Sequence, residues 1–214
     1  MSRSALRTEV LKPGMRVGLF GGSFDPVHGG HLHVARTALK RLALDRVWWI
    51  VSPQNPLKPH APGDLARRLR AVEAAARAPR MVVTDIEARL GLRYTADLIA
   101  HLTAVHPGVR FVWIMGADSL AGLHRWKDWQ AIAARVPIAV IARPTDPIRA
   151  RLSRAARTLS RHRLPQSRAG ALPACPPPCW TYLTAPLHGE SSRALRASGA
   201  RPASPRSLPE ASSE

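Results

Sequence analysis

Apolar and polar residues follow two recurring patterns along this chain. Short, β-rich apolar runs predict strands at 17–20, 46–52, 81–84, 109–115 and 137–142. Between them, apolar residues recur every three or four positions, which predicts helices at 29–42, 64–78, 94–106 and 129–135 and a short helix from Asp118. This alternation predicts an α/β fold, a doubly wound parallel sheet that binds ligands beyond the carboxyl ends of its strands.

The pattern weakens beyond residue 143. It predicts an amphipathic, arginine-rich helix at 148–162, an irregular connection at 164–179, a short strand at 180–184 and a closing helix at 191–198. Residues 200–214 lack an apolar pattern, which is typical of a disordered tail. We therefore expect an N-terminal extension at 1–14, a single domain at 15–199 with a short C-terminal helical part, and a tail at 200–214.

The length of 214 residues suits one domain with a good core. No apolar run approaches the roughly 20 residues that span a bilayer, and the first residues lack the apolar stretch of a secretory signal. We therefore expect a cytoplasmic protein with no membrane partner. Cys175 and Cys179 flank three prolines without a nearby cysteine or histidine to complete a metal site, which predicts free thiols. The sequence leaves a homo-oligomer open.

The formal net charge of +18 attracts phosphate groups. It fits a nucleic-acid-binding protein, and it fits an enzyme with small polyanionic substrates equally well. The arginines are scattered, and neither zinc-finger spacing nor an aromatic RNP-like string is present, which disfavours specific nucleic-acid binding. Arginine greatly outnumbers lysine, a bias that genome composition alone can produce.

The stretch 17–35, VGLFGGSFDPVHGGHLHVA, joins a buried strand, a glycine turn and a helix that opens on two histidines. Gly21 and Gly22 permit a tight turn and let backbone amides approach a ligand. His28 and His31 are neighbours at the helix start, beside its unpaired amides and positive dipole end, where phosphate binds. Taken singly, a glycine pair is usually just a turn, and a histidine at a helix start is usually a surface residue or a cap.

Together, the string Gly-Gly-Ser-Phe-Asp-Pro-x-His-x-Gly-His resembles the signature of the HxGH nucleotidyltransferase superfamily and, within it, the nicotinate-nucleotide (nicotinic acid mononucleotide) adenylyltransferase family. The resemblance implies a Rossmann-like nucleotidyltransferase fold. It implies adenylyl transfer from ATP to nicotinate mononucleotide, giving deamido-NAD and pyrophosphate, with His28 and His31 as catalytic residues. The ATP site that it implies comprises Gly21, Gly22, Ser23, Phe24, Asp25, His28, His31, Asp118, Ser191, Ser192 and Arg196.

Further segments resemble the mononucleotide site of the same family. They are SPQNPLK at 52–58, TDIEARLGLRYT at 84–95 and IMGADSLAGLHRWKDW at 114–129. The residues carried over to this site are Lys58, Thr84, Tyr94, Thr95 and Trp126, with Trp126 stacking on the pyridine ring. Each segment also has a structural interpretation. Lys58 can be a solvated loop residue, Thr95 and Asp118 can be helix N-caps, and Trp129 can serve packing.

The last match, ESSRALR at 190–196, is weaker. Ser191, Ser192 and Arg196 hold their places, and helix-start serines with an arginine suit a triphosphate. Glu190 replaces an apolar residue of the family pattern, and Arg193 stands where threonine is frequent. The negative charge of Glu190 near the expected triphosphate leaves open an adapted or impaired site.

The sequence shows no serine–histidine–acid arrangement, so we expect no covalent intermediate. The phosphate of a mononucleotide can attack the α-phosphorus of ATP directly, and the protein supplies alignment and charge stabilisation. Mg²⁺ would arrive with ATP, since no carboxylate cluster for a protein-held metal is visible. Three alternatives stay open: an adenylyltransferase for nicotinamide mononucleotide or phosphopantetheine, a basic nucleic-acid-binding protein, and an inactive relative that binds nucleotide without turnover.

Overall fold

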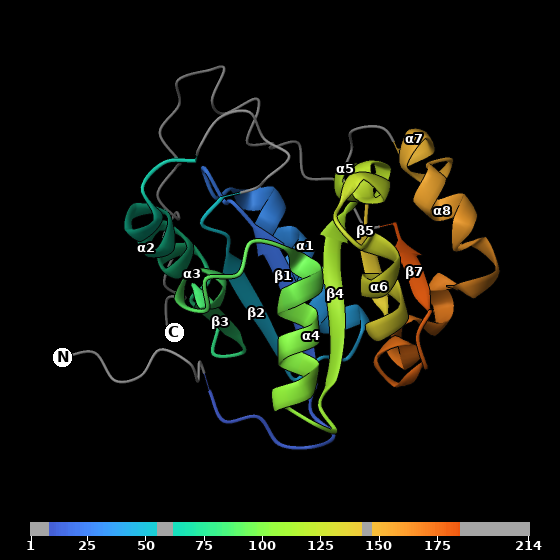
Figure 1. Ribbon diagram of the computed structural model, residues 1–214, viewed down its shortest axis with the longest axis horizontal. Helices are drawn as coiled ribbons and strands as arrows, with labels where there is room; N and C mark the ends of the chain where they lie inside the picture. The colour runs from blue at the N-terminus through green and yellow to red at the C-terminus, as the bar shows by residue number, and fades with distance from the viewer. Residues whose placement is uncertain (1–8, 55–61, 143–146, 185–214) are drawn as a thin grey trace, which may run out of the picture.

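A parallel β-sheet forms the centre of the molecule in the computed structural model, which describes residues 9–54, 62–142 and 147–184 (Figure 1). Within these residues the sheet has seven strands in the order β3-β2-β1-β4-β5-β7-β6, and each neighbouring pair is parallel. The strands are β1 (Arg16–Gly22), β2 (Arg46–Val51), β3 (Met81–Thr84), β4 (Arg110–Gly116), β5 (Ile138–Ile141), β6 (Arg163–Leu164) and β7 (Trp180–Leu183). The predicted doubly wound parallel sheet is confirmed.

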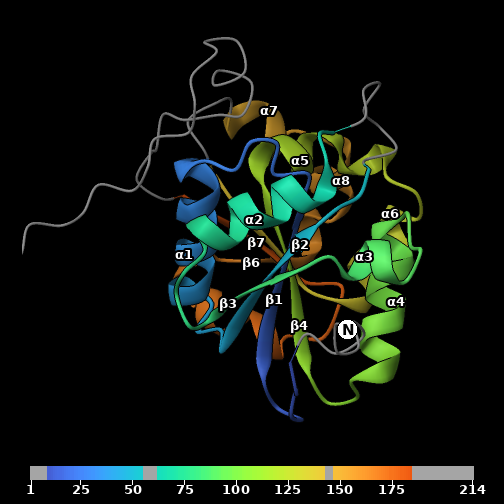
Figure 2. The same ribbon diagram turned by 90° about the vertical axis from the view of Figure 1, so that its left-hand side faces the viewer.

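Helices cover both faces of the sheet, which gives three layers (Figure 2). One face carries α1 (Gly29–Arg41) and α2 (Leu65–Ala75), and the other carries α3 (Ile86–Arg89), α4 (Thr95–Val105) and α6 (Trp129–Arg135). Beyond β4, α5 (Ala117–Gly122) packs against α7 (Pro147–Arg151) and α8 (Arg154–Thr158). Short 3-10 helices span Leu123–Arg125, Ser160–His162 and Gln166–Ala174. None of the described helices is long and apolar enough to cross a membrane.

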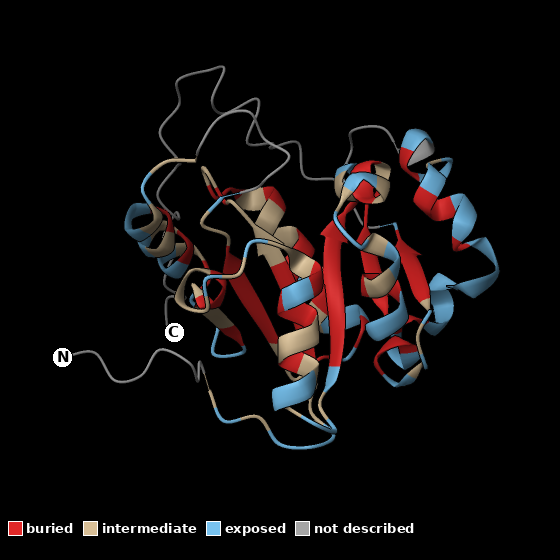
Figure 3. Ribbon diagram, viewed as in Figure 1, coloured by how far each residue is buried: buried red, intermediate tan, exposed pale blue. Residues whose placement is uncertain are grey.

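Successive residues of each strand enter different cores, because side chains alternate between the two faces of a sheet. Trp48 packs in the core beneath α4 and α6, whereas Trp49 packs in the core beneath α1 and α2. Both rings are almost fully buried. Double coverage explains why β2 and β4 are continuous apolar runs. Figure 3 shows buried strands between helices whose outer faces are exposed.

Two predicted helices differ from the structure. The predicted helix at 64–78 ends at Ala75, because Ala76 leaves the helical conformation and Pro79 disfavours helix in the residue before it. The prediction of one helix at 148–162 is wrong. After α7, the Ser153 hydroxyl accepts a hydrogen bond from the Ala156 N–H (3.3 Å), so it caps a separate helix, α8.

Other predictions concern the ends of the chain. The segment predicted as an irregular connection, 164–179, contains the 3-10 helix at 166–174. Glu9, in the predicted N-terminal extension, accepts hydrogen bonds from Arg46 Nε (3.1 Å) and Trp48 Nε1 (3.0 Å), so it lies against β2. The predicted closing helix at 191–198 and the tail lie outside the described residues. The domain limits therefore stay predictions.

The strand order reverses between β1 and β4. From β1 the sheet continues to β2 and β3, and from β4 it continues to β5, β7 and β6. Ligands of open parallel sheets bind at the carboxyl ends of the strands at such a switch point. Gly22 ends β1 and Gly116 ends the adjacent β4. The turn that carries the glycine–histidine motif therefore begins where the topology favours a binding site.

Candidate active site

The end of β1 and the turn after it are built on the hydrophobic core. The predicted turn position of Gly21 and Gly22 is wrong, because both are paired residues at the end of β1 and the turn begins at Ser23. A Cβ at Gly21 would lie 2.6 Å from the Trp113 ring, and one at Gly22 would lie 3.1 Å from the Phe24 ring. Phe24 itself adopts a left-handed conformation with φ of 46°, which is uncommon for a bulky residue. Its ring is buried and contacts Trp49, with centroids 5.2 Å apart. Close packing thus leaves no room for a Cβ at Gly21 unless the Trp113 ring moves, and it leaves little room at Gly22.

The two histidines of the motif form the first turn of α1. His28 is the N-cap, and its Nδ1 accepts a hydrogen bond from the Gly30 N–H (3.1 Å). His31 Nδ1 accepts from the His28 N–H (3.3 Å), which completes a reciprocal capping box made of two imidazoles. The ring centroids lie 3.8 Å apart with an interplanar angle of 33°. The interpretation of His28 as a cap is confirmed, and the cap is part of the histidine pair.

The capping bonds determine the tautomers of both rings. Because each Nδ1 accepts a backbone hydrogen bond, the proton of each neutral imidazole is on Nε2. Both rings can therefore donate a hydrogen bond through Nε2. The His31 ring is oriented by Phe24, with centroids 5.1 Å apart, and His28 is buried. Acidic residues are absent from the first turn of α1. Two donors beside the positive end of a helix dipole suit an anion such as phosphate.

Three side chains close to the end of β3 form a polar cluster. The Thr84 hydroxyl, almost fully buried, accepts hydrogen bonds from the Ile86 N–H (3.2 Å) and Arg89 Nη2 (2.9 Å). Arg89 also forms an ion pair with Asp85 (Nε–Oδ1 2.7 Å). Sequence reasoning identified Thr84 and missed Arg89, whose i,i+4 spacing from Asp85 was the available signal.

Glu87 connects α3 to the loop after β2. It is 5% exposed, and burial raises its pKa, while a hydrogen bond with Ser52 acts in the opposite direction. Ser52 is also tied to β1, because its N–H donates to the Gly22 carbonyl (2.9 Å). Sequence reasoning missed Glu87, since a glutamate in a short helix looks like a solvated residue.

Two of the predicted mononucleotide-binding segments lie side by side. The Lys127 ammonium lies 4.4 Å from the centroid of the Tyr94 ring, which brings the residue after Trp126 next to the Tyr-Thr pair. Trp126 is half-buried and meets Trp113 edge to face at 6.2 Å. Trp129 packs on the same core, so its predicted packing role is confirmed.

The N-cap interpretations of Thr95 and Asp118 are wrong. Tyr94 occupies the N-cap position of α4, and Thr95 is the first residue of that helix. Gly116 occupies the N-cap position of α5, and Asp118 lies exposed in the first turn. Thr95 is thus the first residue of α4, and Asp118 is the second residue of α5, which directly follows β4.

The chain is similar to known proteins over most of its length. Residues 19–195 match the cytidylyltransferase-like family. The probable nicotinate-nucleotide adenylyltransferase of Ruegeria pomeroyi is 54% identical over 188 residues, which cover 88% of each chain. That of Cereibacter sphaeroides (strain ATCC 17025) is 55% identical over 185 residues, 86% of this chain and 98% of the relative. The chain belongs to the nicotinate-nucleotide adenylyltransferase family.

A solved structure extends the likeness to the fold. The nicotinic acid mononucleotide adenylyltransferase of Plasmodium falciparum, complexed with NaAD, superposes with a TM-score of 0.66 over 86% of this chain and 83% of that one. The sequence identity is 16%, so this likeness is one of fold. It confirms the predicted Rossmann-like architecture of the adenylyltransferase family.

The roles of individual residues in this adenylyltransferase-family chain stay predictions. Within the described residues, Gly21 and Gly22 are the last two residues of β1, and Ser23, Phe24 and Asp25 lie between β1 and the histidine pair. In the same part of the chain, no cluster of three or more His, Cys, Asp or Glu side chains could hold a metal ion. Among the residues that the sequence analysis singled out, those outside the described ranges are Lys58, Glu190, Ser191, Ser192, Arg193 and Arg196.

Proposed function

We propose that this chain transfers the adenylyl group of ATP to nicotinate mononucleotide and releases pyrophosphate and deamido-NAD. The observation that supports this most strongly is the closely spaced histidine pair at the start of α1, next to the topological switch point. The names of relatives at 54% and 55% identity support the same reaction. The choice of the acid over the amide mononucleotide rests on those names.

The histidine pair holds the phosphates of ATP in this proposal. Nε2–H of His28 and of His31 donates to oxygens of the triphosphate, and the amino end of α1 adds its dipole. These donors become more effective as negative charge develops on the leaving pyrophosphate. The mononucleotide phosphate attacks the α-phosphorus in line, so the protein needs no nucleophile of its own.

Nucleotidyltransferases of this kind use a divalent metal with ATP. We propose Mg²⁺, which enters as part of the ATP substrate and is bound by phosphate oxygens and water. The chain's own residues then act on the remaining phosphate oxygens. Asp118, exposed in the first turn of α5, accepts a hydrogen bond from a ribose hydroxyl in this proposal. The ATP-site roles of Ser191, Ser192 and Arg196 rest on the family pattern.

The mononucleotide occupies the other part of the site in this proposal. Trp126 offers a flat surface for the pyridine ring, and stacking adds about 1 kcal/mol beyond burial of area. The contact between Lys127 and Tyr94 supports a pocket shared by the two segments, with Thr95 as a hydroxyl donor to the carboxylate. Thr84 shapes this pocket from β3, and Lys58 is the phosphate contact that the family pattern implies.

A pyrophosphate-release assay tests the proposed reaction. ATP and Mg²⁺ are combined with nicotinate mononucleotide, nicotinamide mononucleotide or phosphopantetheine as acceptor. We expect nicotinate mononucleotide to give the highest kcat/KM. A preference for either other acceptor would contradict the proposed substrate, and no turnover with any of them would indicate an inactive relative. Salt-dependent binding of DNA or RNA without turnover would favour the nucleic-acid alternative.

A further inference from the structure

Arg68 is a buried arginine of α2 that serves no predicted role. Its side chain is 3% exposed, whereas Arg67 and Arg70 on the same helix are exposed. Burial lowers the pKa of Arg68, whereas the negative charges of Asp25 and Asp64 raise it. Among the described residues, neither carboxylate forms an ion pair with Arg68, and Asp25 pairs with Arg67 instead. A guanidinium has no neutral form at physiological pH, so its donors need acceptors inside the protein.

Four backbone carbonyls supply those acceptors. Nε donates to Gly63 O (2.7 Å), Nη1 donates to both Ser23 O (2.9 Å) and Ser52 O (2.7 Å), and Nη2 donates to Pro53 O (3.2 Å). Ser23 belongs to the turn that leads into the histidine pair. Ser52 and Pro53 begin the loop after β2, and Gly63 precedes α2. One side chain therefore joins three segments that are separate in the sequence.

Neighbouring contacts strengthen this junction. Asp25 Oδ2 accepts from the Gly63 N–H (2.9 Å), so the turn after β1 meets the start of α2 a second time. The hydrogen bond from the Ser52 N–H to Gly22 O ties the loop after β2 to β1. Ser52 in turn holds Glu87, which extends the connection to α3. The guanidinium lies at the centre of these contacts.

The chemistry of this junction indicates that the Arg68 guanidinium has a role beyond stabilising the fold. A buried charge is expensive, and its replacement by apolar side chains of similar size is often neutral or stabilising for folding. What the guanidinium supplies is a planar fork whose donors fix several carbonyls in defined directions, which lysine cannot reproduce. Such a device is suited to holding two loops at a constant separation.

We propose that Arg68 is a positioning residue for adenylyl transfer. It fixes the turn that presents His28 relative to the loop after β2, so that the triphosphate and the attacking phosphate meet in line. This inference rests on the proposed function, because the loop after β2 is assigned to the mononucleotide. A displacement of about 1 Å between reacting groups can reduce the rate on the order of 100-fold. Arg68 acts through the two loops and touches neither substrate.

The test compares Arg68→Lys with Arg70→Met, a control at an exposed arginine of α2. We expect Arg68→Lys to lower kcat at least 10-fold, with KM for ATP and for the mononucleotide changed less than fivefold. Arg70→Met keeps the wild-type kcat. Circular dichroism and thermal unfolding give the folded fraction of each variant. A wild-type kcat in folded Arg68→Lys overturns the proposal, and so does a loss of activity that matches a loss of folded protein.

Chemical rescue separates positioning from structure. In Arg68→Ala, added guanidinium at millimolar concentration can occupy the vacated volume and bridge the same carbonyls. We expect it to raise kcat of Arg68→Ala several-fold, with no effect on His28→Ala or the wild type. Failure of guanidinium to raise kcat in the folded variant counts against Arg68. If the wild type prefers another acceptor, the proposed substrate fails, and the same comparison with that acceptor still decides the role of Arg68.

Discussion

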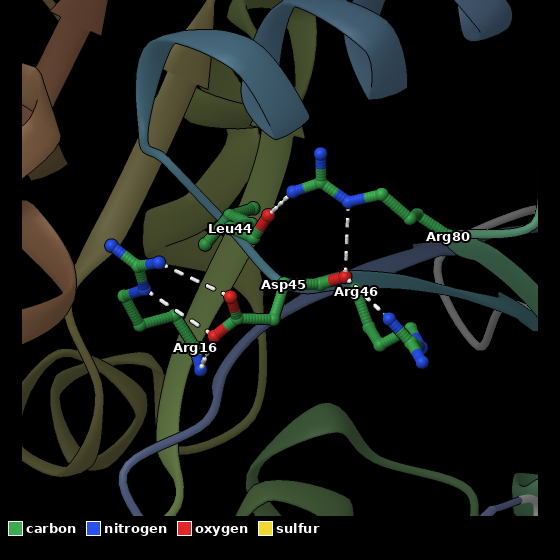
Figure 4. A network of polar contacts seen from close by, with 5 residues as sticks. All are labelled: Arg16, Leu44, Asp45, Arg46 and Arg80. Atoms are coloured by element: carbon green, nitrogen blue, oxygen red, sulfur yellow. Dashed lines mark hydrogen bonds and ion pairs between the residues drawn. The ribbon is translucent and has the colours of Figure 1, made fainter.

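The two ends of the parallel sheet use their polar side chains in different ways. At the amino end, charges pair with one another: Asp45 accepts from the Arg16 N–H (2.8 Å) and Nη2 (3.1 Å), and Arg46 pairs with Glu9 (3.1 Å). Arg80 donates to the Asp45 carbonyl (3.2 Å) and to Leu44 O (Figure 4). At the carboxyl end, by contrast, the histidine pair and Arg68 bond to backbone groups.

This difference indicates that charged groups at the amino end of the sheet stabilise the fold, whereas those at the carboxyl end are available to a ligand. Ion pairs and the hydrogen bonds of Arg80 join the starts of β1, β2 and β3, and the half-exposed Arg16–Asp45 pair is worth about 0–1 kcal/mol in stability. At the strand ends, backbone donors and acceptors hold the histidine pair and Arg68 without neutralising positive charge, and the Arg89–Asp85 ion pair lies apart from them, close to the end of β3. We expect changes at the carboxyl end to affect activity and changes at the amino end to affect stability.

The largest effect is expected from His28. His28→Ala removes a donor to developing negative charge, and such losses are about 100- to 1,000-fold in kcat. It also removes the N-cap of α1, worth about 1 kcal/mol of stability. His28→Asn separates the two effects, because asparagine is a good N-cap without an imidazole. We expect His28→Asn to unfold at the wild-type urea midpoint and to lose activity as His28→Ala does. Wild-type kcat in either variant would remove His28 from the mechanism.

Gly21 tests how firmly the core fixes the end of β1. The Cβ of Gly21→Ala would lie 2.6 Å from Trp113, so the ring or the strand must move, at about 1–3 kcal/mol of stability. Gly22→Ala is the milder variant, because its Cβ would lie 3.1 Å from the Phe24 ring. Urea unfolding should rank Gly21→Ala below Gly22→Ala and both below the wild type. Equal stability of all three would contradict the packing account.

Asp45→Asn is the matching change at the amino end. We expect a loss of roughly 0.2–1 kcal/mol at pH 7 and no change in kcat. The hydrogen bond from Arg16 lowers the pKa of Asp45 below its unfolded value. The carboxylate therefore stabilises the fold above about pH 4, and this contribution disappears as pH falls through the lowered pKa. Urea midpoints of wild type and Asp45→Asn should differ at pH 7 and converge in acid; a constant difference would refute the linkage.

The smallest effect concerns Cys179, which precedes β7 at the amino end. Both cysteines are free thiols, as predicted. Burial, with a hydrogen bond that the Cys179 thiol donates to Cys175, raises the pKa of Cys179 to about 12. Its thiolate is therefore scarce at pH 8, and we expect slow alkylation by iodoacetamide, measured by peptide mass spectrometry. The raised pKa also means that stability falls as pH rises above about 8.5, where the unfolded thiol ionises. Rapid labelling of Cys179 at pH 8 in the folded protein would contradict this.

Sequence patterns predicted the local features of both ends. The apolar runs located β3 at 81–84 and α6 at 129–135 with their observed bounds, because burial on two faces or one face leaves a clear period. The histidine pair was also visible, since its three-residue spacing and the glycine turn lie within one short stretch. Patterns within short stretches of sequence are therefore enough to predict these elements and the histidine motif.

Long-range contacts could not be predicted in the same way. Arg68 sits among other arginines of an amphipathic helix, and its acceptor at Ser23 lies 45 residues away. Which of three neighbouring arginines turns inward depends on how α2 packs across β1 and β2. The break after α7 was missed for a related reason, because Ser153 stops one helix and starts another within an unbroken amphipathic pattern.

A crystal structure with a non-hydrolysable ATP analogue tests the central claim most directly, namely that the histidine pair holds the triphosphate. The account predicts phosphate oxygens within about 2.7–3.2 Å of Nε2 of both His28 and His31, at the amino end of α1. A triphosphate bound elsewhere on the molecule, with neither imidazole in contact, would contradict the account.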